Sequence, residues 1–453
     1  MQTVRIKKGY RFHIAGSPSD ILTRLPAPDR VAILPETIPH IKPRLKVSVG
    51  DAVKIGSVLF TDKNDSRFRF LSPGGGRIAD IEFGPRRVIK AIVVDRQTDD
   101  EPEIEFPVVD EKQLNRIAPR HLADHIVDRG MWWVFRELPF RNLPNPDLIP
   151  PMILVGLDAQ EPFQPSPAVY LKDAETDFAY GLKVLNRLAD HRVVVHTAKS
   201  LQAQVDTGRK VLTHVISGCY PSDDSGTVHY HIKTGRDQNR AWFITGQDLI
   251  LLARMLLLGR YPVDRVISVA GSAAPVRQHY RARMGAPLAL LVDPAELKGD
   301  ERLVVGGLLR GYERGSDGYL GLYETALNIV PRGGPAEFLS LFKPGFAKPS
   351  YSRTFASKFN RAPMVFDCKR HGDQRACIAC MHCADVCPVD MLPQMVYKAV
   401  LAREVEEYLE LGLLDCVECG LCTYVCPSKI ELRQTFVETK AAYAKEQTQN
   451  RTV

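Results

Sequence analysis

The sequence contains no apolar run long enough to cross a membrane. Its longest apolar stretch, LILLARMLLLG at residues 249–259, is interrupted by Arg254 and has about half the length of a membrane span. The opening segment MQTVRIKKGYRFHI carries several charges and has no continuous apolar core, so no signal peptide is expected. These absences predict a cytosolic chain that has no transmembrane helix and reaches a membrane only through partner proteins.

A dense block of basic residues is also missing. The 60 Lys and Arg residues and 53 Asp and Glu residues give a formal net charge of only +7. Because no Lys/Arg cluster is interleaved with aromatic residues, a nucleic-acid partner is not expected. The composition, 45% apolar and 25% charged over 453 residues, indicates a globular protein of several domains.

A glycine-rich phosphate loop is absent where a nucleotide site would need one. From residue 152 the sequence reads as an apolar strand, an amphipathic helix and a second apolar strand, which predicts a βαβ unit with a parallel sheet. The first strand-to-helix turn of a nucleotide-binding unit normally carries G-x-G-x-x-G, and ILVGLDAQEPF does not. We therefore predict a Rossmann-like α/β domain over residues 151–258 without a conventional NADH site, and binding of FMN or NAD(H) stays open.

Cysteine is scarce outside one short segment, since nine of the ten cysteines lie between Cys368 and Cys426. A cytosolic compartment keeps thiols reduced, so disulfides are not expected and the clustering predicts metal binding. Two runs share the spacing C-x-x-C-x-x-C-x-x-x-C-P. They comprise Cys377, Cys380, Cys383 and Cys387 before Pro388, and Cys416, Cys419, Cys422 and Cys426 before Pro427.

This spacing is typical of proteins with two [4Fe–4S] clusters, in which the fourth cysteine of each run binds the cluster of the other run. Structural zinc instead prefers pairs of cysteines separated by a long loop, which leaves the third and fourth spacings unexplained. We therefore predict a pair of [4Fe–4S] clusters with interleaved ligands. Cluster 1 is assigned to Cys377, Cys380, Cys383 and Cys426, and cluster 2 to Cys416, Cys419, Cys422 and Cys387.

The remaining candidates for metal binding are weaker. Cys368 and Cys219 are interpreted as ordinary thiols, although Cys368 is near enough in sequence to be a spare ligand. His229 and His231 would share one face if their segment were a strand, and they could then form a metal-binding pair, but hydrogen-bonded histidines are the simpler interpretation.

The domain organisation follows from changes in hydrophobic pattern. Short alternating runs with Gly and Pro turns at residues 45–83 predict tight hairpins and resemble a lipoyl-like barrel-sandwich module. Gly-rich turns between short strands at 261–332 fit a β-grasp-like, SLBB-like domain, and the segments 395–414 and 429–447 have helical spacing. The predicted fold is multidomain α/β plus β. Its parts are a barrel-sandwich domain (1–100), a connecting segment (101–150), the Rossmann-like α/β domain (151–258), the β-grasp-like domain (259–345) and a helical ferredoxin-type two-cluster domain (346–453).

Several segments in order along nearly the whole chain, RIKKGYRFHIAGSPSD, GDAVKIGSVLFTDKN, RGMWWVFRELPF, YPVDRVISVAG, GYLGLY and LCTYVCPSK, resemble the NqrA family of subunits of the sodium-translocating NADH:quinone oxidoreductase. Common members of that family lack the full first cysteine run, whereas this chain has both runs complete. In that respect, and in the segment CPVDMLPQMVY, it is similar to the RnfC component of the related Rnf electron-transport complex.

The resemblance implies a peripheral electron-transfer subunit on the cytoplasmic side of the cell membrane. Its expected partners are integral membrane subunits and a flavoprotein that donates or accepts electrons, within an ion-translocating NADH:quinone reductase; the isolated chain is not expected to be active alone. A quinone at the partner interface stays open. Two alternatives remain: an RnfC-type protein that handles NADH or flavin and ferredoxin electrons, and a non-catalytic docking scaffold.

Overall fold

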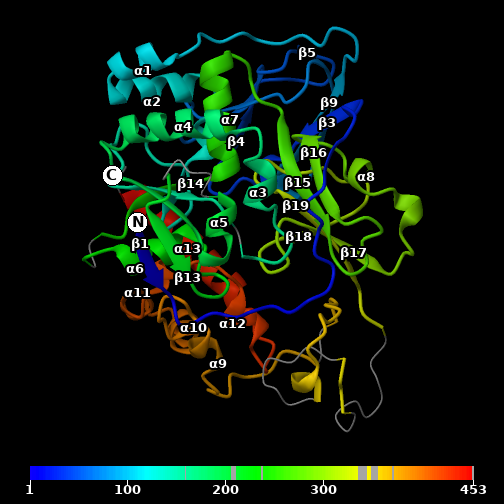
Figure 1. Cartoon of the computed structure of the whole chain (residues 1–453), viewed down its shortest axis with the longest axis vertical. Helices are drawn as coiled ribbons and strands as arrows, with labels where there is room; N and C mark the ends of the chain where they lie inside the picture. The colour runs from blue at the N-terminus through cyan, green and yellow to red at the C-terminus, as the bar shows by residue number, and fades with distance from the viewer. Residues whose placement is uncertain are drawn as a thin grey trace.

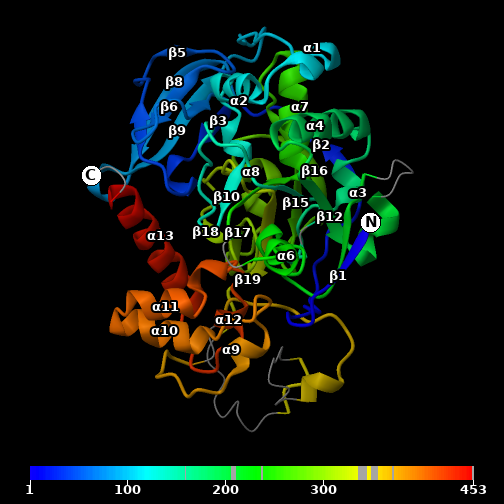
Figure 2. The same ribbon diagram turned by 90° about the vertical axis from the view of Figure 1, so that its left-hand side faces the viewer.

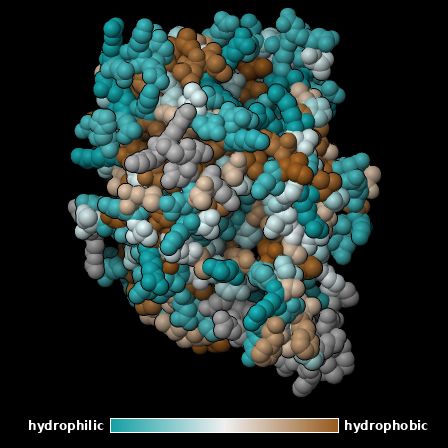
Figure 3. All heavy atoms as spheres, in the orientation of Figure 1, coloured by the Kyte–Doolittle hydropathy of each residue, from teal (hydrophilic) through white to brown (hydrophobic). Residues whose placement is uncertain are grey.

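The computed structural model describes residues 1–158, 160–205, 211–235, 238–334, 344–347, 356–369 and 372–450. Within them, a small all-β module lies at one end of the molecule and the cysteine-rich helices lie at the other (Figures 1 and 2). Two larger sheets occupy the space between these ends. No described helix is both long and apolar enough to cross a membrane. The face in Figure 3 is largely hydrophilic, with hydrophobic residues in small separate groups.

The all-β module consists of two small antiparallel sheets that share one core. The rings of Phe60 and Phe70 stack there with centroids 4.6 Å apart, beside the buried side chains of Ile78 and Ile92. The four-stranded sheet has the order β3-β9-β8-β5, and the three-stranded sheet has the order β4-β6-β7. The strands are β3 (Arg30–Ile33), β4 (Pro43–Leu45), β5 (Ala52–Val53), β6 (Val58–Asp62), β7 (Arg69–Leu71), β8 (Gly76–Phe83) and β9 (Ile89–Arg96).

A six-stranded sheet with the order β1-β13-β12-β11-β14-β10 forms the α/β layer, and all its neighbouring strands are parallel except β10 and β14. The βαβ unit predicted from residue 152 is present as β11, α4 and β12. The apolar stretch 249–259 forms most of α7, which packs on α4 inside the protein. The elements are β1 (Gln2–Arg5), β10 (Arg136–Leu138), β11 (Ile153–Gly156), α3 (Pro167–Tyr170), α4 (Glu175–Leu188), β12 (Val193–Ala198), α5 (Gln202–Val205), β13 (His214–Ser217), α6 (Ser225–Ile232), β14 (Ala241–Thr245) and α7 (Gly246–Leu258).

The second six-stranded sheet is mixed, with the order β18-β17-β19-β15-β16-β2. Its assignment as β-grasp-like stays a prediction. Residues 335–343 and 348–355, which flank the predicted boundary at 345, lie outside the described part of the chain. The elements are β2 (Leu22–Arg24), β15 (Asp264–Ala270), β16 (Gln278–Arg283), α8 (Leu288–Leu291), β17 (Glu301–Val305), β18 (Tyr312–Arg314) and β19 (Ala326–Pro331).

The N-terminal segment contributes a strand to each of the two larger sheets before the all-β module begins. Strand β1 pairs in parallel with β13 at one edge of the α/β sheet, and β2 pairs in parallel with β16 at one edge of the mixed sheet. Strand β10, from the segment predicted as a connection, forms the opposite edge of the α/β sheet. That segment also contains α1 (Glu111–Arg116) and α2 (Pro119–Asp128) and the buried Trp132 and Trp133.

The C-terminal segment is helical around its own core, in which buried Val396, Leu421 and Phe436 surround the cysteines. The helices are α9 (His382–Asp385), α10 (Pro393–Ala402), α11 (Val405–Glu410), α12 (Leu421–Tyr424) and α13 (Leu432–Asn450). The segment 395–414, predicted to be helical, contains most of α10 and all of α11. Arg403 has a left-handed φ of 62° and ends α10, so the chain turns before α11 begins.

Candidate metal centres

The two cysteine runs have the same backbone course. Ala379 and Glu418 precede the second cysteine of each run with φ of 52° and 57°, and Met381 and Gly420 follow it with φ of 66° and 82°. Short helices α9 and α12 begin at the next residues, 382 and 421. Left-handed residues on both sides of a cysteine wind the chain tightly, so that successive cysteines point toward the same space. The repeat in sequence is therefore also a repeat in conformation.

Each run borders one hollow, and the lining of each hollow also includes cysteines of the other run. The first hollow, of about 350 Å³, is lined by Cys377, Cys380, Cys383 and Cys426. The second hollow, of about 370 Å³, is lined by Cys416, Cys419, Cys422, Cys387 and also Cys383. The hollows are therefore neighbours, with the side chain of Cys383 bordering both. The structure brings the eight cysteines of the two runs to these two neighbouring hollows, and their division into two interleaved ligand sets stays a prediction.

The hollows differ in their exposure. At the first, Cys380 is exposed and the neighbouring Ile378 has 67% of its surface accessible. At the second, Cys387 and Cys419 are buried, and the loop of the second run faces the rest of the protein. Gly420 there lies against the backbone carbonyl of Leu309, where an added Cβ would come within 3.0 Å of the oxygen. The first hollow is the one nearer to solvent.

Burial favours the neutral thiol at several of these cysteines. Burial raises the pKa of Cys383 to about 11 and the pKa values of Cys387 and Cys419 to about 12. Thiolate, not thiol, binds metal, so metal binding at these positions releases protons to solvent. Backbone amides already favour the charged form at some of these cysteines, for example that of Glu418 at Cys416 and that of Leu421 at Cys419.

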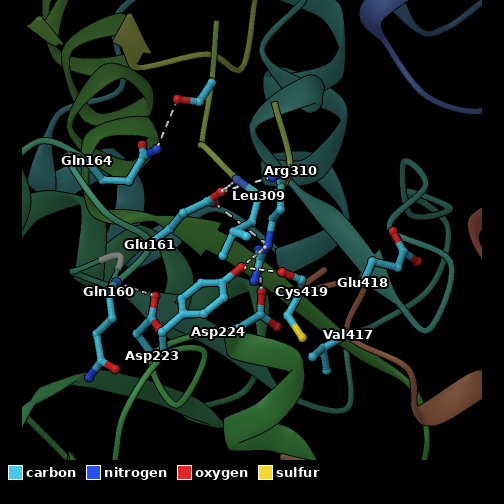
Figure 4. Close-up of polar contacts among 12 residues, drawn as sticks. Gln160, Glu161, Gln164, Asp223, Asp224, Leu309, Arg310, Val417, Glu418 and Cys419 are labelled. Atoms are coloured by element: carbon cyan, nitrogen blue, oxygen red, sulfur yellow. Dashed lines mark hydrogen bonds and ion pairs between the residues drawn. The ribbon is translucent and has the colours of Figure 1, made fainter. Parts of the chain in front are cut away.

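Behind the second hollow lies a network of ion pairs that joins three parts of the chain. Asp224, at the start of α6, binds Arg141 at 2.9 Å and Arg310 at 2.8 Å, and Figure 4 shows the pair with Arg310. Burial opposes ionisation of Asp224, but the two guanidinium groups outweigh it and hold its pKa well below the usual range. Glu418, within the second run, binds Lys440 of α13 at 2.6 Å, and Lys440 and Arg141 lower its pKa against the effect of burial.

These charged residues were missed by sequence reasoning, which selected other members of the segment SGCYPSDDSGTVHYH. His229 and His231 lie on helix α6, so the interpretation as two residues on one face of a strand was wrong. His231 instead forms a hydrogen bond with the carbonyl of Pro388, 2.8 Å away. The useful signal in the segment was the pair of aspartates directly before a helix, since Asp224 caps α6 by accepting from the amide of Gly226.

A third hollow of about 1080 Å³ lies at the carboxyl ends of the parallel strands β11, β12 and β13. Its lining includes the aromatic residues Tyr10, Phe12 and Tyr220, together with Cys219 and Asp158. One carboxylate oxygen of Asp158 is buried without a hydrogen-bond partner, and burial raises the pKa of this residue to about 6. Cys368 lies elsewhere, where its amide donates to the carbonyl of Pro331.

An all-β module, a parallel α/β layer and paired four-cysteine loops define a multidomain iron–sulfur protein. Family models match three parts of the chain in this order: the NqrA N-terminal barrel-sandwich hybrid domain at residues 4–97, the NqrA second alpha/beta domain at 117–261, and a 4Fe-4S dicluster domain at 376–430. The barrel-sandwich, α/β and iron–sulfur predictions are confirmed at this level.

The chain is also similar to curated proteins over almost its whole length. It is 30% identical over 432 residues to the NqrA protein of the Na(+)-translocating NADH-quinone reductase of Neisseria meningitidis serogroup C, covering 94% of this chain and 96% of that one. It is 31% identical over 433 residues, with the same coverage, to the corresponding protein of Actinobacillus pleuropneumoniae serotype 5b. The chain belongs to this NqrA family of Na(+)-translocating NADH-quinone reductase subunits. A solved NAD+-reducing [NiFe]-hydrogenase aligns with a TM-score of 0.38 at 12% identity, over 72% of this chain and 64% of that one, which is too weak to support an argument.

Proposed function

We propose that this chain is the peripheral electron-transfer subunit of a membrane ion-translocating NADH:quinone oxidoreductase and that it carries two [4Fe–4S] clusters. The relatives at 30% and 31% identity are named as a subunit of such a reductase, and the dicluster match covers both cysteine runs. Its partners are integral membrane subunits on the cytoplasmic side and a flavoprotein that donates or accepts electrons. The observation that carries the proposal is the pair of neighbouring hollows. The first is lined by three cysteines of the first run and Cys426, and the second by three cysteines of the second run with Cys387 and Cys383.

The ligand assignment follows the lining of the hollows. Cluster 1 belongs to Cys377, Cys380, Cys383 and Cys426, and cluster 2 to Cys416, Cys419, Cys422 and Cys387. Among the described residues, no three His, Cys, Asp or Glu side chains converge closely enough to hold a single metal ion. Thiols that stand around a hollow, rather than meeting at one point, suit a multi-iron core better than a zinc ion, and soft thiolate ligands suit iron–sulfur cores.

The residues around the hollows would keep the two centres at unequal depth. When bound, the clusters supply one-electron transfer, with a potential that depends on hydrogen bonds and solvent exposure. Cys380 and Ile378 place cluster 1 at the surface, where a redox partner can approach. Most residues that line the second hollow are buried, among them Cys387, Cys419 and Leu421, so cluster 2 would lie deeper in the chain. Cys380 and Ile378, at the exposed first hollow, would give a redox partner access to cluster 1, and the deeper second hollow would hold the centre that exchanges electrons with it.

The experiment is anaerobic purification of the full chain, followed by iron and sulfide analysis and electron paramagnetic resonance. About eight irons per chain with two interacting reducible centres are expected. Cys380→Ser and Cys419→Ser should each remove one centre, whereas Cys368→Ser should remove none and serves as the control. Zinc in place of iron, with no paramagnetic signal after reduction, would end the proposal. Full turnover of the assembled complex with one centre missing would favour the docking-scaffold alternative.

The third hollow favours a second candidate, an RnfC-type protein that handles NADH or flavin. Ligands of open α/β sheets bind outside the carboxyl ends of the parallel strands, which is the position of this hollow. The missing glycine-rich loop and the carboxylate of Asp158 both disfavour a phosphate there. Equilibrium titration of the full chain with FMN and with NADH tests this candidate. Binding in the micromolar range that is lost in Gly218→Trp, at the wall of the hollow, supports it, and no binding removes it.

A further inference from the structure

Four consecutive backbone carbonyls in the second cysteine run are each held by a side chain from outside the loop. Cys416 O accepts from Lys440 Nζ at 2.9 Å, and Val417 O accepts from Arg141 Nη2 at 2.9 Å. Glu418 O accepts from Arg433 Nε at 2.9 Å, and Cys419 O accepts from the Tyr220 hydroxyl at 2.7 Å. Figure 4 shows Cys419 and Val417 facing the ion pair of Arg310 and Asp224.

The four donors come from three separate parts of the chain and are themselves fixed. Arg141 follows β10 and is held by Asp224, while Tyr220 follows β13 and accepts from Arg310 Nε at 3.1 Å. Lys440 is only 3% exposed and is held by Glu418. These partners restrain the donor side chains, so the cysteine loop binds to donors whose positions are fixed by the rest of the fold. Hydrogen bonds inside a protein, where the local dielectric constant is low, are stronger than in water.

The direction of the carbonyls decides the direction of the amides. In a trans peptide the C=O and the following N–H point in opposite directions, so carbonyls of residues 416–419 that point outward turn the amides of 417–420 inward. The amide of Glu418 is hydrogen-bonded to Cys416 accordingly. The positive ends of these peptide dipoles thus face the second hollow.

We infer that Arg141, Tyr220, Arg433 and Lys440 are positioning residues that raise the reduction potential of the cluster held by Cys416, Cys419, Cys422 and Cys387. The inference rests on the proposed function, since it concerns one of its two clusters. Reduction adds one electron to the cluster, and inward amides stabilise the added negative charge. Asp224 and Glu418 offset much of the positive charge of the donors, so the oriented peptide dipoles, rather than net charge, carry the effect.

The first run supplies an internal comparison. There the hydroxyl of Ser428 donates to the carbonyl of Ala376 at 2.8 Å, and the exposed Arg375 donates to the carbonyl of Pro427 at 3.0 Å. The hydroxyl that donates to Ala376 is neutral, whereas three of the four donors to the second run are cationic. Changes to the four positioning residues should therefore move one potential and leave the other unchanged.

The test is a redox titration of the anaerobically purified full chain, followed by electron paramagnetic resonance, with Tyr220→Phe and Arg433→Gln. Each variant is also prepared with Cys380→Ser, which leaves only cluster 2 to observe. Each single change should lower the equilibrium constant for reduction of cluster 2 severalfold. The double variant should lower it about tenfold, which corresponds to about 59 mV for a one-electron couple. Arg375→Gln, beside the first run, is the matched control and should leave cluster 2 unchanged.

The possible results distinguish failure of the inference about the positioning residues from failure of the proposed function. Absence of iron and of any reducible signal in the wild-type chain would overturn the proposed function itself. Two normal centres whose potentials do not move in Tyr220→Phe and Arg433→Gln would overturn only the inference, and so would equal shifts of both centres. Tyr220→Phe removes a single hydroxyl and keeps the ring, so a result remains available if Arg433→Gln loses iron.

Discussion

Asp224 Oδ2 lies 2.8 Å from Arg310 Nη1, and this ion pair connects the α/β layer to the mixed sheet directly behind the second cysteine run. The other oxygen of Asp224 binds Arg141 at 2.9 Å, so a single carboxylate neutralises two guanidinium groups. Arg141 also donates to the carbonyl of Val417 in the second cysteine run, and Arg310 donates to the hydroxyl of Tyr220. Asp224 is thus the point where three sequence segments far apart in the chain meet behind the second hollow.

Replacing this carboxylate should weaken the assembly of the domains. In Asp224→Asn, Arg141 and Arg310 lose their shared counter-charge, while the amide oxygen can still cap α6. Breaking a buried ion pair by removing one partner typically costs about 3 kcal/mol or more. We expect guanidinium to release the cluster absorbance at a lower concentration than in the wild-type chain. Asp128→Asn, at an exposed pair with Arg69 of 3.5 Å, is the control and should change stability by less than about 0.5 kcal/mol.

If each cluster takes its fourth ligand from the other cysteine run, substitutions of the fourth cysteines should remove different centres than they would if each run held its own cluster. Cys426 belongs to the second run by sequence but lines the hollow of the first, and Cys387 belongs to the first run but lines the hollow of the second. Cys426→Ser should therefore remove the same paramagnetic centre as Cys380→Ser, and Cys387→Ser the same centre as Cys419→Ser. If Cys426→Ser and Cys419→Ser remove the same centre instead, the ligands are not exchanged between runs.

The cysteine loops could be predicted from sequence because ligand spacing is a local property. Three cysteines at intervals of three, with a fourth beyond, need no information about the rest of the fold. The hairpins of the all-β module and the βαβ unit beginning at 152 are local patterns of the same kind. By contrast, the break at Arg403 depends on one backbone conformation that helical spacing does not reveal.

Long-range pairings could not be predicted in this way. Strand β1 joins β13, with Gln2 opposite His214, and nothing in the first five residues specifies that partner. Likewise, no spacing rule relates Arg141, Asp224 and Arg310, because their contact exists only after three domains have packed together. The charged residues behind the second hollow are therefore a product of tertiary structure, whereas the cysteine run beside it is visible in the sequence.

The buried Asp223 predicts a pH dependence of stability. Burial, followed by the nearby charge of Asp158, raises the pKa of Asp223 from 3.8 to about 8. Because the folded pKa lies above the unfolded value, its contribution to stability is fully present below pH 3.8 and is lost as pH rises through 8. Asp223→Asn, which is neutral at every pH, should therefore be more stable than the wild-type chain at pH 8.5. A difference of one pKa unit between folded and unfolded chains corresponds to about 1.4 kcal/mol.

Thermal unfolding at pH 5 and pH 8.5 measures this effect. The advantage of Asp223→Asn should be at least about 1.4 kcal/mol at pH 8.5 and smaller at pH 5. Asp128→Asn again provides the exposed control and should show no such trend. An advantage that is equal at both pH values would mean that Asp223 is already ionised in the folded chain.

Removal of iron should loosen the C-terminal segment selectively. Its core groups Val396, Leu421 and Phe436 with the cysteines, and in the described residues this core is separate from the one that packs α4 against α7. Anaerobic chelation leaves two hollows lined by neutral thiols, so α10 and α12 lose packing that the α/β layer does not depend on. Hydrogen exchange followed by mass spectrometry should show faster exchange in α10 and α12 and unchanged exchange in α4 and α7. Equal acceleration in all four helices would show that the clusters stabilise the whole chain, and no acceleration would show that the helical segment is stable without them.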